Sequence, residues 1–361
     1  MSAKSLPWRA ASVAFIILFA GIAPAVAWDE SGHVTITSLA ISKLPETMPG
    51  WLKDPEVVAR LRYLCAEPDR LRGQQSPVVD HFNNPDHYID EELLRPFNLS
   101  LKTLPPLRRQ FTDLMAAERA LHPDKFKPYD PKDDASYTRL SPGMLPYRIA
   151  ELQWKISADW TTLKTYEKHR DLVTDQMIRN ARENVIYDMG IISHFVGDGS
   201  QPLHLTEHHH GWVGDNPKGY TREHGIHQYI DSGVIFDQHI TFESLASQAR
   251  APKRISKDDY WQDILSYLDK TYQEVEPLYV LEKSGDLKKE PGRKFIEDRL
   301  LEGGSMLAGV WVAACENAKI DEYREKQLMA NKHLPAATQP AEKTPEPAKD
   351  DKQTETTGSK P

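Results

Sequence analysis

The sequence predicts an all-α protein, a compact single-domain helical fold with a loop-rich insertion. Apolar residues recur at steps of three and four over several long stretches, which is the period of one helix face, whereas runs alternating apolar and polar residues are scarce. The 361 residues are 39% hydrophobic and 27% charged, an ordinary composition for a soluble globular chain. This composition excludes a multi-pass membrane protein, a collagen-like repeat and a wholly disordered chain.

The clearest helical patterns lie in the middle of the chain, over 149–163 and 178–196. Similar spacing predicts helices over 107–121, 260–281 and 295–314. Seven prolines interrupt residues 91–145, which we interpret as the insertion, with the 107–121 helix as its one regular element.

The two ends of the chain differ from the predicted domain, which spans 28–334. Residues 1–27 contain Lys4 and Arg9, an apolar run and a final Ala25-Val26-Ala27, the pattern of a secretory signal peptide. Cleavage between Ala27 and Trp28 would give a secreted or periplasmic protein, and an uncleaved anchor is the alternative. Residues 335–361 lack aliphatic residues larger than Ala and all aromatics, so we expect a disordered tail.

Charge and cysteine content limit the functions further. The net charge of -8 argues against tight nucleic-acid binding by phosphate neutralisation alone, so a nucleic-acid substrate would require positive charge from bound metal. Cys65 and Cys315 are the two cysteines, and the sequence leaves open whether they form a disulfide or remain two buried thiols.

The strongest motif ends the 178–196 helix, in the run HFVGDGSQPLH. His194 and Asp198 are four residues apart and therefore share one helix face, and Pro202 ends the helix so that His204 can fold back beside them. A buried His and Asp on so apolar a helix need a partner, and a metal ion satisfies both.

Other fragments offer further ligands. His227 and Asp231 repeat the four-residue spacing, and Asp69, His87 and the Trp28–His33 segment add weaker candidates. These imidazoles and carboxylates suit zinc. The imidazoles must be neutral to bind it, so we expect zinc occupancy to fall below about pH 6. The run of His208, His209 and His210 is more typical of a solvated loop. Signatures of a serine hydrolase elbow, a phosphate-binding loop, an HExxH protease and a dinucleotide site are absent.

These residues resemble the superfamily of zinc-dependent phospholipases C and single-strand-specific nucleases of the S-one/P-one type. Their shared pattern is an N-terminal Trp, then His, Asp and His, followed by HxxxDxxxxxH and HxxxD/E. The chain supplies all nine positions in this order: Trp28, His33, Asp69, His87, His194, Asp198, His204, His227 and Asp231. The resemblance extends from residue 28 to about 320.

The resemblance implies three zinc ions per chain. The first would be held by Asp69, His87, His194 and Asp198. The second would be held by His204, His227 and Asp231. The third would take the amine and carbonyl of Trp28, His33 and a shared oxygen of Asp198. The implied reaction is hydrolysis of a phosphate ester by zinc-activated water, with Asp198 as a bridging ligand and Asp69 orienting the water.

The resemblance also suggests the substrate. The short Trp28–His33 interval and Asp231 favour the nucleases and 3′-nucleotidases, in which an aromatic at the position of Tyr88 stacks a base that Asp90 and Arg95 could contact. Against this, the nucleases' disulfides are missing, and the insertion lengthens the His87–His194 interval. A phospholipase C is the alternative, and a non-catalytic secreted zinc-binding protein is the second alternative. No stable protein partner is implied.

Overall fold

The computed structural model describes residues 28–139 and 141–330, and its described part is all-α, without a β-strand. The predicted signal peptide and tail lie outside these residues. The α-helices, in chain order, are α1 (Glu30–Ser42), α2 (Pro55–Leu64), α3 (Glu67–Arg72), α4 (Pro77–Asn83), α5 (Glu91–Leu94), α6 (Arg108–Leu121), α7 (Leu145–Lys168), α8 (Asp175–Asp198), α9 (Ile226–Gln228), α10 (Val234–Asp237), α11 (Phe242–Leu245), α12 (Tyr260–Tyr272), α13 (Val275–Ser284), α14 (Glu290–Asn317) and α15 (Glu322–Ala330).

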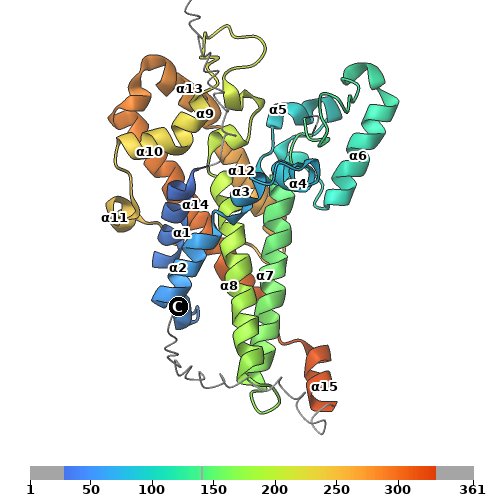
Figure 1. Cartoon of the computed structure of the whole chain (residues 1–361), viewed down its shortest axis with the longest axis vertical. Helices are drawn as coiled ribbons and strands as arrows, with labels where there is room; N and C mark the ends of the chain where they lie inside the picture. The colour runs from blue at the N-terminus through green and yellow to red at the C-terminus, as the bar shows by residue number, and fades with distance from the viewer. Residues whose placement is uncertain (1–27, 140, 331–361) are drawn as a thin grey trace, which may run out of the picture.

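Two long helices, α7 and α8, form the antiparallel hairpin on which the molecule is built (Figure 1). Thr174 caps α8 by accepting a hydrogen bond from the Met177 amide, 3.2 Å away. Helix α14 packs against both members of the hairpin, and α1 packs against α8 and α14. One continuous hydrophobic core joins these four helices. The site-bearing end of α8 therefore lies inside the protein rather than at its surface.

The sequence pattern missed α1, because this helix is buried on most sides and carries polar residues among the aliphatic ones. Thr35 and Ser38 are buried, and their hydroxyls donate to the carbonyls of Ser31 and Val34, four residues earlier, at 2.8 and 2.6 Å. These bonds satisfy the hydroxyls within the helix, so polar side chains can occupy positions that periodicity assigns to aliphatic ones. Helix α1 places His33 in the interior.

The helix predicted over 260–281 is instead two helices, α12 and α13, separated at Gln273 and Glu274. Pro277 explains the break: it lacks the N–H that would bond to the Gln273 carbonyl, so one helix cannot continue through this position. The helices predicted over 107–121, 149–163, 178–196 and 295–314 are confirmed as α6, α7, α8 and α14.

The 91–145 segment contains α6 as its one long helix, together with α5 and short 3₁₀ turns. Buried Phe111 of α6 stacks on Tyr147 of α7 at a ring-centroid distance of 5.3 Å, which attaches the segment to the hairpin. Cys65 and Cys315 are both buried free thiols. In the described part of the chain, every helix is too short or too polar to cross a membrane.

Candidate metal centre

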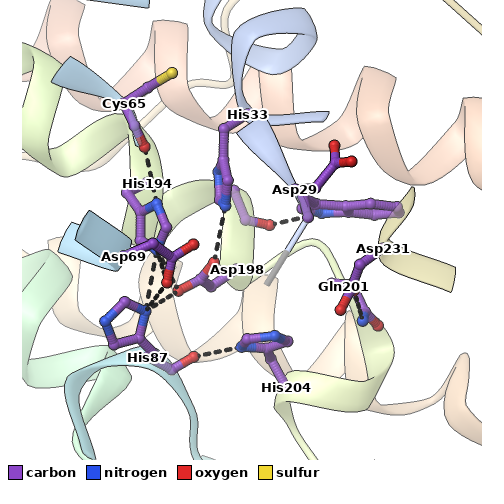
Figure 2. Close-up of polar contacts among 12 residues, drawn as sticks. Asp29, His33, Cys65, Asp69, His87, His194, Asp198, Gln201, His204 and Asp231 are labelled. Carbon is purple, nitrogen blue, oxygen red and sulfur yellow. Dashed lines mark hydrogen bonds and ion pairs between the residues drawn. The ribbon is translucent and has the colours of Figure 1, made fainter. Parts of the chain in front are cut away.

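The last two turns of α8 bring His194 and Asp198 into the interior, and both side chains are fully buried. The His194 Nδ1–H donates to the Cys65 carbonyl at 2.8 Å. Because a carbonyl only accepts, this bond fixes the tautomer and leaves Nε2 facing the site without a proton. The Nε2 atom lies 3.5 Å from Asp198 Oδ2, so both side chains offer lone pairs to the same space (Figure 2).

A first group forms where two other segments meet the end of α8. His87, at the end of a 3₁₀ turn (Asn84–His87), places Nδ1 3.1 Å from Asp198 Oδ2 and 3.0 Å from His194 Nε2. Asp69, on α3, places Oδ1 3.7 Å from His194 Nε2 and 3.9 Å from His87 Nδ1. The four residues that the resemblance assigns to the first zinc therefore converge.

A second group lies beside the first. His204 follows Pro202 in a short 3₁₀ turn, and its Nδ1–H donates to the His87 carbonyl at 2.6 Å, which joins the two groups. His227 Nε2 is 3.4 Å from Asp231 Oδ2, and all three side chains present ligand atoms within 4.8 Å of one another. Asp231 lies in a π-helical turn (Tyr229–Gly233), a rare distortion often found at functional sites.

His33 occupies a third position. Its ring stacks on that of His194 at 4.0 Å, and its Nε2 lies 3.4 Å from Asp198 Oδ1, the carboxylate oxygen facing away from His87. Gly197 makes the approach possible, since a Cβ there would lie only 2.6 Å from His33 Nδ1. His33 also forms a potential metal-binding group with Asp69 and His194.

Trp28 lies at this same end of the site. Its buried indole N–H approaches both the Gly197 carbonyl and the Ser200 hydroxyl at 3.0 Å, and the amide of Asp29 donates to the Asp231 carbonyl at 3.3 Å. The start of the described chain is therefore held next to His33 and Asp231. Coordination by the Trp28 amine stays a prediction, because residue 27 lies outside the described residues.

Unpaired buried atoms indicate that these residues fit metal ions. Within 28–139 and 141–330, Asp198 Oδ1, Asp231 Oδ2, His204 Nε2 and both ring nitrogens of His33 and His227 have no hydrogen-bond partner. Leaving such an atom unpaired costs about 1–3 kcal/mol. Imidazole nitrogens and carboxylate oxygens are ligands that zinc accepts, and divalent cations at these groups would satisfy the carboxylate oxygens and one nitrogen of each imidazole.

Burial shifts the pKa values of these groups toward their neutral forms. Burial, with a smaller contribution from the His204 imidazole, lowers the pKa of His33 to about 3, and burial likewise lowers the pKa of His204 to about 3. Burial raises the pKa of Asp69 to about 6 and raises the pKa values of Asp198 and Asp231 well above 3.8. In the metal-free site, the carboxyl groups rather than the imidazoles therefore hold the protons that compete with a cation.

A pocket of about 510 Å³ opens onto the second group and is lined by both His204 and His227. Tyr88 and Asp90 line the pocket, and Oδ1 of the buried Asp90 has no hydrogen-bond partner among the described residues and lies 4.0 Å from His209 Nδ1. The structure does not bring Arg95 to this pocket, since its guanidinium donates to the Tyr272 hydroxyl at 3.1 Å.

Several pocket residues were not predicted from the sequence. Arg72, Asp80, Asn84 and Arg139 line the pocket without belonging to any motif. The His208–His210 run is not a solvated loop, because it forms a 3₁₀ turn (Glu207–His210) whose last two residues line the pocket. The run is held inward by Trp212, which stacks on His208 at 4.0 Å, and by the Tyr279 hydroxyl, which donates to the His208 carbonyl.

No protein-family model and no curated protein sequence matches this chain. The conclusion therefore rests on the structure: the described part of the chain is all-α and contains three His/Asp groups that can hold metal ions. These groups are His33 with Asp69 and His194, His87 with His194 and Asp198, and His204 with His227 and Asp231.

Proposed function

We propose that the protein is a zinc-dependent hydrolase of phosphate esters, with a single-stranded nucleic acid or a nucleotide as the main substrate class. The observation that carries the proposal is the sharing of ligands between groups. The two oxygens of Asp198 face His33 on one side and His87 on the other, so one carboxylate can serve two cations, whereas His194 offers only its Nε2 atom. Such shared residues are expected where several cations lie close together around one reacting phosphate.

Bound zinc ions would supply a water activated near neutral pH and positive charge for the phosphate. Asp69 is suited to orient this water and accept its proton, because its side chain is 11% exposed whereas Asp198 is fully buried. Arg72, whose Nη1 lies 3.3 Å from Asp69 Oδ1, lines the pocket and adds a fixed cation beside the phosphate.

Tyr88 supports a nucleotide rather than a simple phosphate. It directly follows the ligand candidate His87, and its side chain lines the pocket. Stacking of one base on one aromatic ring contributes about 1–3 kcal/mol, which helps to offset the acidic overall charge. Asp90, in the same pocket, can hydrogen-bond the edge of a base.

A phospholipase C is the runner-up, and one observation favours it. A second cavity of about 440 Å³ shares Ser141 with the first pocket, and its walls include the apolar side chains of Phe82, Met115 and Met144. Such a cavity could accept an acyl chain.

The test is a side-by-side assay of the zinc-loaded chain beginning at Trp28. Single-stranded DNA, RNA, a nucleoside 3′-phosphate and phosphatidylcholine are the substrates, and His194→Ala is the inactive control. His122→Ala, at a half-exposed histidine that follows α6 and does not line the pocket, is the matched control and should keep full activity. We expect hydrolysis of the nucleic-acid substrates. Hydrolysis of lipid alone would reverse the ranking, and no hydrolysis with full zinc occupancy would favour the non-catalytic zinc-binding protein.

A further inference from the structure

The metal-site pocket has a second wall that no metal ligand contributes to. Thr138, Arg139 and Ser141 line it, and all three come from the end of the 91–145 segment. Because the implied metal ligands His204 and His227 line the same pocket, the two walls come from chain segments far apart in sequence.

The backbone of this second wall is anchored by one carboxylate. Asp134 Oδ1 accepts a hydrogen bond from the Thr138 amide at 3.0 Å, and its Oδ2 accepts one from the Arg139 amide at 2.9 Å. The Ser136 hydroxyl also donates to Oδ1, at 3.1 Å. The turn that presents Arg139 is therefore fixed at its base.

The same wall is joined to the segment that carries His87, Tyr88 and Asp90. The Tyr88 hydroxyl donates to the Thr138 carbonyl at 3.4 Å, and the Asp90 amide donates to the Pro142 carbonyl at 2.6 Å. Gly143 permits this contact, since it has a φ of +106° and an added Cβ would lie 2.0 Å from the Tyr88 carbonyl oxygen. Arg139 is thus held at a defined position relative to Tyr88.

The guanidinium of Arg139 is not used to hold the fold together. Its side chain is exposed, and within the described residues it makes no ion pair or side-chain hydrogen bond. Arg72, the other arginine of the pocket, instead pairs with Asp69. A cation with a fixed backbone and an unpaired head is suited to bind an anion, and a guanidinium matches the geometry of a phosphate.

We propose that Arg139 binds a second phosphate of the substrate, so that the protein selects substrates with two phosphates flanking a nucleoside. The proposal rests on the proposed function, which places the first phosphate at the His/Asp groups. The pocket then presents, between two walls, a binding group for each part of a single strand. These are ligands for one phosphate, the aromatic Tyr88 for a base, and Arg139 for the next phosphate. A pocket of about 510 Å³ is in the range that holds a ligand of this size.

The test uses pairs of thymidine dinucleotides with the same internal phosphodiester. In each pair one dinucleotide carries an added terminal phosphate, at the 5′ end in one pair and at the 3′ end in the other. Wild-type protein should prefer the form with the added phosphate by about tenfold in kcat/KM, the gain expected of one charge-assisted hydrogen bond. Arg139→Gln should remove this preference, and Arg139→Lys should keep part of it. Arg109→Gln is the matched control, because Arg109 is 85% exposed on α6 and pairs with Asp113.

Equilibrium binding of uncleavable phosphonate analogues of the same dinucleotides separates this proposal from the proposed function. A plot of the logarithm of the binding constant against the logarithm of the salt concentration has a negative slope. Its magnitude should decrease by about 0.7 in Arg139→Gln, only for the analogue with the added phosphate. The same binding preference without any hydrolysis would refute the proposed function and retain the phosphate site. An unchanged preference in Arg139→Gln, or an equal loss on both dinucleotides, would overturn the role of Arg139. Equal binding of a phospholipid by the wild type and by Arg139→Gln, without binding of either dinucleotide, would also overturn this role.

Discussion

The two halves of α8 belong to one continuous helix but differ in what surrounds them. Over 175–188 the helix has a buried face, with Ile178, Ala181 and Val185, and an exposed face, whereas 189–198 is buried on all sides. The first half stabilises itself by packing on its neighbours. The second half places His194 and Asp198 where water cannot reach them, and such groups are stable only with a partner.

Burial has opposite effects on stability in the two halves of α8. In the first half, burying aliphatic carbon favours folding. The second half holds Asp198 Oδ1 buried and unpaired beside the unpaired nitrogens of His33, which lies on α1, and this loss of stability is recovered only when cations bind. The stability of the half over 189–198, the site half, should therefore depend on metal, whereas that of the half over 175–188, the hairpin half, should not.

The largest expected effect comes from changing one carboxylate in each half. Asp198→Asn should reduce the zinc content and lower turnover by more than about 100-fold. This loss exceeds the one expected for a residue that only hydrogen-bonds a metal ligand, which is about 10–100-fold. Asp188→Asn is the matched change in the hairpin half, where Asp188 is buried and pairs with Lys155 at 2.8 Å. It should alter thermal stability and leave zinc content unchanged. Equal zinc loss in both variants, measured by metal analysis, would remove the distinction between the halves.

The next effect concerns the start of the chain, which is held against the site half. An internal Trp offers no metal ligand, whereas a terminal Trp28 offers an amine and a carbonyl. Protein with a Met or a tag before Trp28 should hold about one zinc ion fewer and turn over poorly. Scarless proteolysis that exposes the Trp28 amine should restore both. Identical zinc content and activity before and after proteolysis would exclude the amine as a ligand.

The pH dependence of metal binding is a smaller effect and also belongs to the site half. Asp69, with a pKa of about 6, is protonated in the metal-free protein below that pH, whereas His33 and His204, with pKa values of about 3, are already neutral. Zinc binding at pH 5.5 should therefore release protons. The ionisation of Asp69 should make the affinity for zinc rise with pH and level off above about pH 6–7. Calorimetry in two buffers of different ionisation enthalpy measures this release. Binding without proton release would contradict the assignment.

The smallest expected effect is a core change in the hairpin half. Ile178→Val removes one buried methylene and should lower the free energy of unfolding by about 0.5–1.5 kcal/mol. Zinc content and kcat should stay unchanged, which denaturant unfolding and steady-state kinetics measure. A loss of zinc from this variant would show that the two halves are coupled.

The sequence could predict those parts of the fold and the site that depend on local spacing. The hairpin helices follow from period 3.6, and His194 and Asp198 share a face because they are one turn apart. Asp69, His87 and His33 come from three other segments, and their convergence is a property of tertiary packing that only the resemblance suggested. The inward position of His209 and His210 depends on Tyr279, about 70 residues away, so no local pattern could reveal it.

The central claim is that the three His/Asp groups hold three metal ions. Metal analysis of the chain beginning at Trp28, purified without a chelator at pH 7.5, tests this claim most directly. We expect close to three zinc ions per chain. A count of zero or one would contradict the account, because the unpaired atoms of His33, Asp198 and His227 would then have no common explanation.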